Sequence, residues 1–139
     1  MANIALISCV KKKGDKKMKA RCLYTSNFFV KSLLYAEKIL KADKIFILSA
    51  KHGLLTLDEE IEPYEETLND KNRDEQRKWA KFVYEKIEKS CDAKNDMFNI
   101  LAGKKYYQDL IAYLPKTQVI AKNLPLYKKN QWLKRQLDE

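Results

Sequence analysis

The sequence predicts a single α/β domain, a three-layer sandwich in which helices flank a mainly parallel sheet of about four strands. Three observations lead to this fold class. Short apolar runs alternate with amphipathic stretches, the apolar runs are continuous in the way of strands buried on both faces, and no repeat or linker divides the chain. A chain of 139 residues is also long enough to bury one substantial core.

Four continuous apolar runs are the predicted strands. They cover residues 3–9, 44–50, 98–102 and 117–121. A helix-length segment separates the first run from the second, so the connection between them is expected to be a right-handed crossover between parallel strands.

Amphipathic stretches between the strands predict the helices. Ser26 has a side chain suited to an N-cap, and apolar residues recur at helical spacing from Phe29 to Leu40. Further helices are predicted over residues 70–91, 103–114 and 131–137. Pro115 follows the third of these helices and is expected to end it.

Two segments have no clear period. Residues 10–24 are crowded with lysine and arginine, and residues 51–69 are acidic and contain Pro63. Long ordered loops in a compact domain usually have a function or cover a site, so the second segment is a candidate for either role.

The charge balance favours anionic partners. The formal net charge is +9, which attracts polyanions or small molecules that carry phosphate. A solvated, lysine-rich surface explains the same charge equally well. The hydrophobic fraction of 45% excludes a disordered basic tail.

The cysteine pattern predicts neither a disulfide framework nor a zinc site. Cys9, Cys22 and Cys91 are odd in number, and no two of them have C-x-x-C spacing. No metal or other cofactor is therefore expected. Free thiols favour a reducing compartment, no apolar stretch reaches the ~20 residues of a membrane span, and no secretory signal is evident. We expect a cytoplasmic protein without a membrane partner.

The ends of the predicted strands carry the most informative residues. Ligands of open parallel sheets bind outside the carboxyl ends of the strands, and here those ends read "SCVKKK", "SAKHG", "GKKYY" and "KNLPLY". Each end has a lysine, and three have small or turn-permitting residues, which suits a phosphate or a nucleotide. The candidate ligand-binding residues at these ends are Ser8, Lys11, Ser49, Lys51, Gly53, Gly103 and Lys104.

Two residues at the strand ends are candidate catalytic groups. His52, the single histidine, could act as an acid or base near neutral pH, or it could simply cap a helix or bond a loop carbonyl. Cys9 lies beside lysines that would lower its thiol pKa, which suits a nucleophile, although buried cysteines more often pack as small apolar residues.

Further candidates lie in the two irregular segments and at the first helix. Tyr24 could stack on a base, and Ser26 begins a helix whose amide groups attract anions, although capping and core packing explain both residues as well. In the acidic segment Glu65, behind Pro63 and Tyr64, is the carboxylate best placed to support a developing positive charge on a sugar. Tyr64 is a candidate ligand contact beside it.

The motifs together resemble a known family. The stretches are "LISCVKKK", "LYTSNFFVKSLLYAE", "ILSAKHGLLTLDEEIEPYEETL", "LAGKKYYQDL" and "QWLKRQL". Nearly end to end, they resemble a family of small bacterial and phage proteins described as a domain of unknown function. More distantly, they are similar to YaaA-type peroxide-stress proteins and to a segment of the archaeosine synthase core, which acts on modified guanine in tRNA.

The resemblance implies an α/β fold and a link to nucleic acids or modified bases. The residues that match the motifs are Ser8, Cys9, Lys11, Tyr24, Thr25, Ser26, Ser49, Lys51, His52, Gly53, Pro63, Tyr64, Glu65, Gly103, Lys104 and Tyr106. The chain departs from the family pattern at Val10, where a second serine is common. It also departs at "NLPLYKKN", which replaces a glycine-rich turn before the last helix.

Three functions are consistent with these residues. The first is an intracellular protein that binds a nucleotide or a nucleobase, either without catalysis or as a hydrolase or transferase at an N-glycosidic bond. In that function His52 is the acid or base, Lys11 and Lys51 hold phosphate, and Glu65 supports the developing charge. The second is a non-catalytic, basic nucleic-acid-binding module, and the third is a nucleotide sensor.

Overall fold

A five-stranded mixed sheet forms the centre of the molecule. The computed structural model describes residues 1–8 and 14–138. The strands of the sheet are β1 (Asn3–Ser8), β3 (Lys44–Ser49), β4 (Gly53–Thr56), β6 (Met97–Leu101) and β7 (Thr117–Val119). Their order is β4-β3-β1-β6-β7, and β1, β3, β6 and β7 are mutually parallel. The predicted parallel sheet is confirmed, with one strand more than expected.

The additional strand, β4, is an antiparallel edge strand inside the segment predicted to be irregular. It pairs with β3 through a tight turn, with Ser49 opposite Gly53. The same segment contains β5 (Glu60–Ile61) and the 3-10 turn η1 (Leu68–Asp70). β5 pairs with β2 (Met18–Lys19), which lies with α1 (Ala20–Leu23) in the lysine-rich segment after β1. The periodicity missed these elements because strands of two to four residues are too short to show one.

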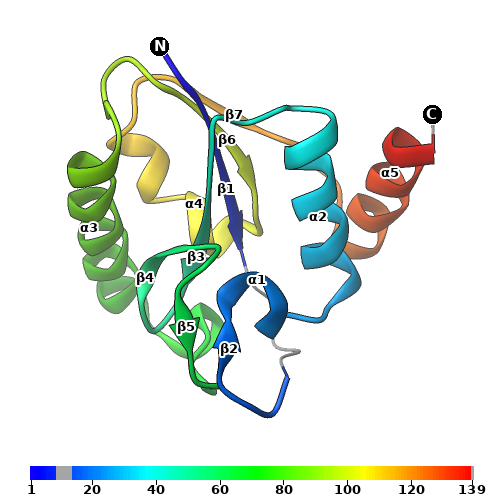
Figure 1. Ribbon diagram of the computed structural model, residues 1–139. Helices are drawn as coiled ribbons and strands as arrows, with labels where there is room; N and C mark the ends of the chain where they lie inside the picture. Colours follow the sequence, from blue (N-terminus) through cyan, green and yellow to red (C-terminus); the bar gives the residue numbers. More distant parts are fainter. Residues whose placement is uncertain (9–13, 139) are drawn as a thin grey trace.

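Helices cover both faces of the sheet and make three layers (Figure 1). The face of α2 (Asn27–Lys38) and α5 (Leu126–Asp138) opposes the face of α3 (Arg73–Ser90), α4 (Lys104–Tyr107) and η2 (Leu110–Ala112). Each face of the sheet has its own hydrophobic core, and alternate residues of β1 pack into the two. Ala5 and Ile7 pack with α2, whereas Ile4 and Leu6 pack with α3. The predicted three-layer sandwich is therefore confirmed.

The predicted helices differ from the observed ones at their ends. The capping box of Asn72 and Glu75 starts α3 at Arg73. The expected helix over 103–114 is two short turns, α4 and η2. The last helix starts earlier than predicted, because the Pro125 carbonyl accepts a hydrogen bond from the Lys129 amide and opens α5 at Leu126.

The carboxyl ends of the parallel strands all point to one end of the molecule. The amino terminus lies at the other end, and β2, β5 and α1 gather where β1 and β3 finish (Figure 1). The chain leaves β1 for one face of the sheet and leaves β6 for the other, so the strand order reverses between these two neighbours. Doubly wound sheets open a crevice at such a point.

Candidate functional site

Two adjoining hollows lie outside the carboxyl ends of β1 and β6. One has a volume of about 420 Å³ and the other about 260 Å³. Both are lined by Phe28, Gly103, Lys104 and Leu126, so they form one continuous depression, which we call the strand-end cleft. Ser8, the last residue of β1, lines the smaller hollow. The cleft therefore lies where the strand order reverses.

The smaller hollow has a largely apolar wall. Phe28 stands in the first turn of α2, which the Ser26 hydroxyl caps by accepting a hydrogen bond from the Phe29 amide at 3.1 Å. Tyr106 lies opposite on α4, and its ring meets the Trp79 ring edge-on at 5.6 Å. Leu126 of α5 completes this wall. Flat apolar surfaces of this kind suit an aromatic ligand.

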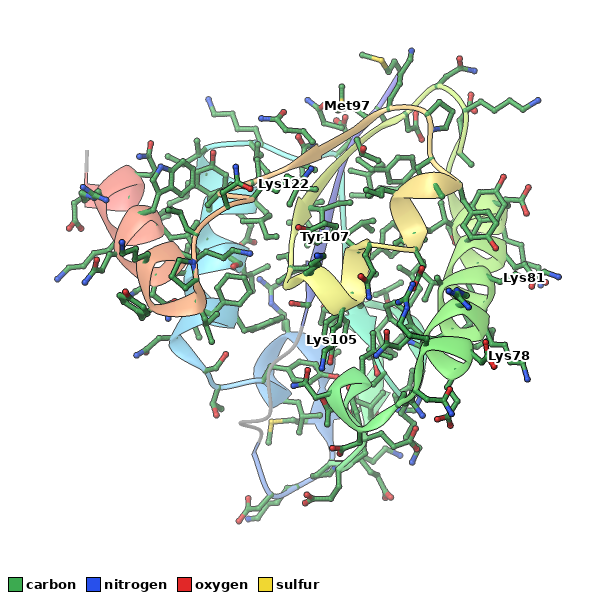
Figure 2. The ribbon with its side chains drawn as sticks, turned by 180° about the vertical axis from the view of Figure 1, so that it is seen from behind. Lys78, Lys81, Met97, Lys105, Tyr107 and Lys122 are labelled. Carbon is green, nitrogen blue, oxygen red and sulfur yellow. The ribbon has the colours of Figure 1, made fainter. Side chains whose placement is uncertain are left out.

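The larger hollow is cationic. Lys104, Lys122 and Lys129 line it, together with Asn123 and Tyr107. Figure 2 shows Lys122 on the segment that leads from β7 to α5, and Tyr107 on α4. Three ammonium groups around one hollow favour an anionic group over a neutral one.

Lys129 is the exceptional member of this group because its side chain is buried. Only 6% of the residue is exposed, and its Nζ donates a hydrogen bond to the Ala102 carbonyl at 3.1 Å. Within residues 1–8 and 14–138, no carboxylate oxygen lies within 4.0 Å of this ammonium group. Desolvation lowers the pKa of Lys129. A buried cation without a counter-ion is costly, which makes its presence in a cleft informative.

A chain of buried hydroxyl groups lies at the end of β3, next to β1. The Tyr64 hydroxyl is 2.6 Å from Ser49 Oγ and 2.5 Å from the Tyr24 hydroxyl. Ser49 Oγ also accepts a hydrogen bond from the His52 amide at 3.1 Å. The Trp79 indole donates to the Ser49 carbonyl at 2.8 Å. These bonds connect the end of β3 to Tyr24, Tyr64 and Trp79.

His52 packs against this chain of hydroxyl groups. Its ring meets the Tyr64 ring edge-on at 5.4 Å, and its carbonyl accepts a hydrogen bond from Lys86. Desolvation lowers the pKa of His52, and the charges of Lys51 and Lys86 lower it further, against a smaller opposing effect of Glu59. The lowered pKa favours the neutral form of the imidazole.

A second hollow of about 500 Å³ lies beside Tyr64, which is one of its lining residues. It is lined by Lys51, Pro63, Tyr64, Glu65, Glu66, Thr67, Asp70, Lys71 and Glu75. It shares no lining residue with the strand-end cleft, although Asn69 of the cleft and Asp70 of this hollow are neighbours in η1. Carboxylates dominate its wall, so it is unsuited to phosphate.

The structure separates the predicted site residues into groups. Ser8, Gly103 and Lys104 line the strand-end cleft, whereas Lys51, Tyr64 and Glu65 line the second hollow. Tyr24, Ser49 and His52 belong to the hydrogen-bonded chain around Tyr64, and Ser26 caps α2. The predictions for Cys9 and Lys11 lie outside the described residues.

Gly53 has a clear structural role. Its φ of +77° belongs to the left-handed region, and a Cβ there would stand 2.6 Å from Cε2 of Phe82. The glycine is the buried first residue of β4, directly after the turn from β3, and it packs on Phe82 of α3.

Residues that the sequence did not single out complete the cleft. Phe28, Asn69, Lys122, Leu126 and Lys129 line it. Lys129 carried a signal that could have been noticed: it lies four positions before Leu133, on the inward face of an amphipathic helix. A lysine on such a stripe is rarely buried without a partner.

The fold and the cleft define a class of protein: doubly wound α/β proteins with a ligand-sized depression where the strand order reverses. Within it, the chain belongs to a family of unknown function, DUF6884, whose family model matches residues 4–135. No curated protein matches the chain. No helix in the described ranges is both long and apolar enough to cross a membrane.

Proposed function

We propose that the protein binds a nucleotide in the strand-end cleft, with the phosphate near Lys129 and the base against Phe28 and Tyr106. The observation that carries the proposal is the buried ammonium group of Lys129, which has no carboxylate partner among residues 1–8 and 14–138. An anionic ligand would supply the missing counter-charge and remove the cost of burial. Lys104 and Lys122 add to the attraction from the rim.

The pairing of two unlike hollows favours a nucleotide over a simple anion. The cationic hollow suits a phosphate, and the adjoining hollow, walled by Phe28, Tyr106 and Leu126, suits a planar base. The free cysteines Cys22 and Cys91 support a cytoplasmic setting.

Binding of nucleoside monophosphates tests this proposal. Calorimetry with the four ribonucleotides, their nucleosides and inorganic phosphate should show binding of at least one nucleotide and weaker binding of its nucleoside. Lys129→Met should abolish that binding. Lys134→Met, which removes an exposed ammonium group from the same helix, is the matched control and should bind normally. No binding of any nucleotide by the folded protein would refute the proposal, as would unchanged binding by Lys129→Met.

A catalytic role at an N-glycosidic bond is the second candidate. The observation that favours it is the contact of the His52 imidazole, whose pKa is lowered, with the Tyr64 ring, beside a hollow that Glu65 lines. His52 would act as the base that activates water, and Glu65 would support the positive charge that develops on the sugar. This hollow shares no lining residue with the cleft and has a mainly acidic wall, so binding in the cleft is the leading proposal.

Base release tests the catalytic candidate separately. The protein is incubated with nucleosides, nucleotides and oligonucleotides that contain modified bases, and free base is measured by chromatography. Release that is lost in His52→Ala and Glu65→Gln, but retained in Glu62→Gln, would support catalysis. Glu62 is an exposed carboxylate of the same segment and serves as the control. If no substrate releases base, the catalytic candidate fails, whereas the binding proposal stands on its own measurement.

A further inference from the structure

We propose that the nucleotide in the strand-end cleft belongs to a single-stranded nucleic acid, which continues from the cleft across the first turn of α5. This inference rests on the proposed function and names its substrate class. Three independent observations support it: the segregation of charge along the chain, the open rim of the cleft, and an exposed tyrosine next to that rim.

Net positive charge is concentrated near the end of the chain, which supplies Lys122, Leu126 and Lys129 to the cleft. Residues 110–137 contain six lysines and arginines and no carboxylate. The nearest preceding carboxylate, Asp109, is occupied by a bidentate ion pair with Arg73 at 2.8 and 3.0 Å. In the described ranges of the chain, no ion pair neutralises Lys104, Lys105, Lys122 or Lys128, all of which are exposed. Such a field attracts a phosphate backbone and not only one phosphate.

Among the described residues, those that form the rim of the cleft are exposed, so a bound nucleotide would be only partly enclosed. Gly103, Lys104, Lys122, Asn123 and Pro125 all line it and are all exposed. Small-molecule sites usually bury most of their ligand. An open depression with a buried cation at its base instead suits a nucleotide that enters from a longer chain, with flanking phosphates on the lysines of the rim.

Tyr127 supplies a stacking surface for a neighbouring base. It follows Leu126, which lines both hollows, and 63% of it is exposed, as is 50% of Leu126. Exposed aromatic residues beside a cationic groove are characteristic of single-strand binding, because every base offers a flat face. A duplex is unsuited to this site, since its bases are stacked and paired and cannot enter the cleft.

The second hollow restricts the path of the strand. Its carboxylates, Glu65, Glu66, Asp70 and Glu75, begin directly beside Asn69 at the edge of the cleft. They would repel a phosphate backbone. The strand therefore leaves the cleft in the opposite direction, past Lys122 and the start of α5.

Fluorescence anisotropy with a labelled single-stranded ten-nucleotide RNA and its DNA equivalent tests the inference. We expect at least one of them to bind more than roughly tenfold more tightly than the best mononucleotide at low salt, with weaker binding of the matching duplex. Tyr127→Ala should weaken strand binding by roughly fivefold or more and leave mononucleotide binding unchanged. Lys122→Gln with Lys128→Gln should make the dependence on salt shallower by about 1.4 in log–log slope.

Lys78→Gln with Lys81→Gln is the matched control. It removes the same charge from the outer side of α3, across the molecule from Lys122 (Figure 2). This double variant should bind the strand nearly as wild type does. Equal loss of binding in the control, equal binding of duplex, or strand binding no tighter than mononucleotide binding would overturn the inference. If mononucleotides bind and strands do not, only this inference fails; if neither binds, the proposed function fails as well.

Discussion

The ammonium group of Lys129 lies 3.1 Å from the carbonyl oxygen of Ala102, the residue that follows β6. The contact brings the first turn of α5 to the carboxyl end of the sheet, next to Gly103 and Lys104. It also buries a positive charge at the base of the strand-end cleft. One hydrogen bond to a neutral carbonyl does not replace the hydration that the ammonium group loses, and this deficit is the basis of the proposed binding of an anionic ligand there.

The first prediction concerns the pH dependence of stability at Lys129. Because burial lowers the pKa of Lys129, the folded protein releases this proton at a lower pH than the unfolded chain does. The stability of the wild type relative to Lys129→Met should therefore rise as the pH increases towards the ordinary lysine pKa of about 10.4, and then level off. Urea unfolding of both proteins between pH 7 and 10.5 measures the difference. A difference that stays constant over this range would contradict the prediction.

The second prediction concerns Gly53. Alanine there must adopt a φ near +77° and place its Cβ against the Phe82 ring, so Gly53→Ala should lower the free energy of unfolding by about 1–3 kcal/mol. Adding Phe82→Ala should recover only the part due to the clash, and the strained φ should account for the rest. A double-mutant cycle by urea unfolding separates the two contributions. Unaltered stability of Gly53→Ala would show that the turn has another conformation.

The third prediction concerns the hydroxyl of Tyr64. Tyr64→Phe removes the group that lies between Tyr24 and Ser49, and both of these are buried. We expect a loss of about 1–3 kcal/mol in the free energy of unfolding, because buried polar groups lose a hydrogen-bond partner. Tyr127→Phe, in which the changed tyrosine is mostly exposed, is the control and should change stability by less than about 0.5 kcal/mol. Equal effects of the two substitutions would argue against the buried network.

The fourth prediction concerns the titration of His52, which is convenient because the chain has a single histidine. Its pKa is lowered first by desolvation, then by Lys51, and then by Lys86. Lys51→Gln should raise the pKa of His52, Lys86→Gln should raise it less, and Lys89→Gln should leave it unaltered. The ring proton resonances followed by NMR report each value directly. A larger rise in the pKa of His52 in Lys86→Gln than in Lys51→Gln would contradict this prediction.

The lowered pKa of His52 also determines how the stability of the protein changes with pH. The folded protein binds a proton at His52 less readily than the unfolded chain does. The contribution of His52 to stability is therefore complete above the ordinary histidine pKa of about 6.5, and it decreases as the pH falls from there through the lowered folded value. His52→Gln should remove this acid-side dependence.

Much of the fold could be predicted from local sequence. The continuous apolar runs at 3–9 and 44–50 required burial on both faces, and this requirement leads to parallel strands between helices. The strand-end rule then identified Ser8, Gly103 and Lys104 as cleft residues. The predicted fold is confirmed because it depends on residues that are close together in the chain, whereas a ligand-binding role of the three cleft residues stays a prediction.

Long-range contacts decided the rest. Tyr24 and Tyr64 are 40 positions apart, and Phe82 meets Gly53 from another element, so no local pattern could reveal either contact. The same is true of the separation of Lys51 and Glu65 from the cleft, which depends on the hairpin of β3 and β4.

The sequence by itself determined the layers, the parallel strands and the polar ends of those strands, because the order of apolar and polar residues along a short segment sets its periodicity and its burial. Only the tertiary structure decided which of those ends share a cleft and that Lys129 is buried there without a counter-ion. The physical reason is that strand order and helix docking bring together groups such as Ala102 and Lys129, whose separation in the chain hides their contact.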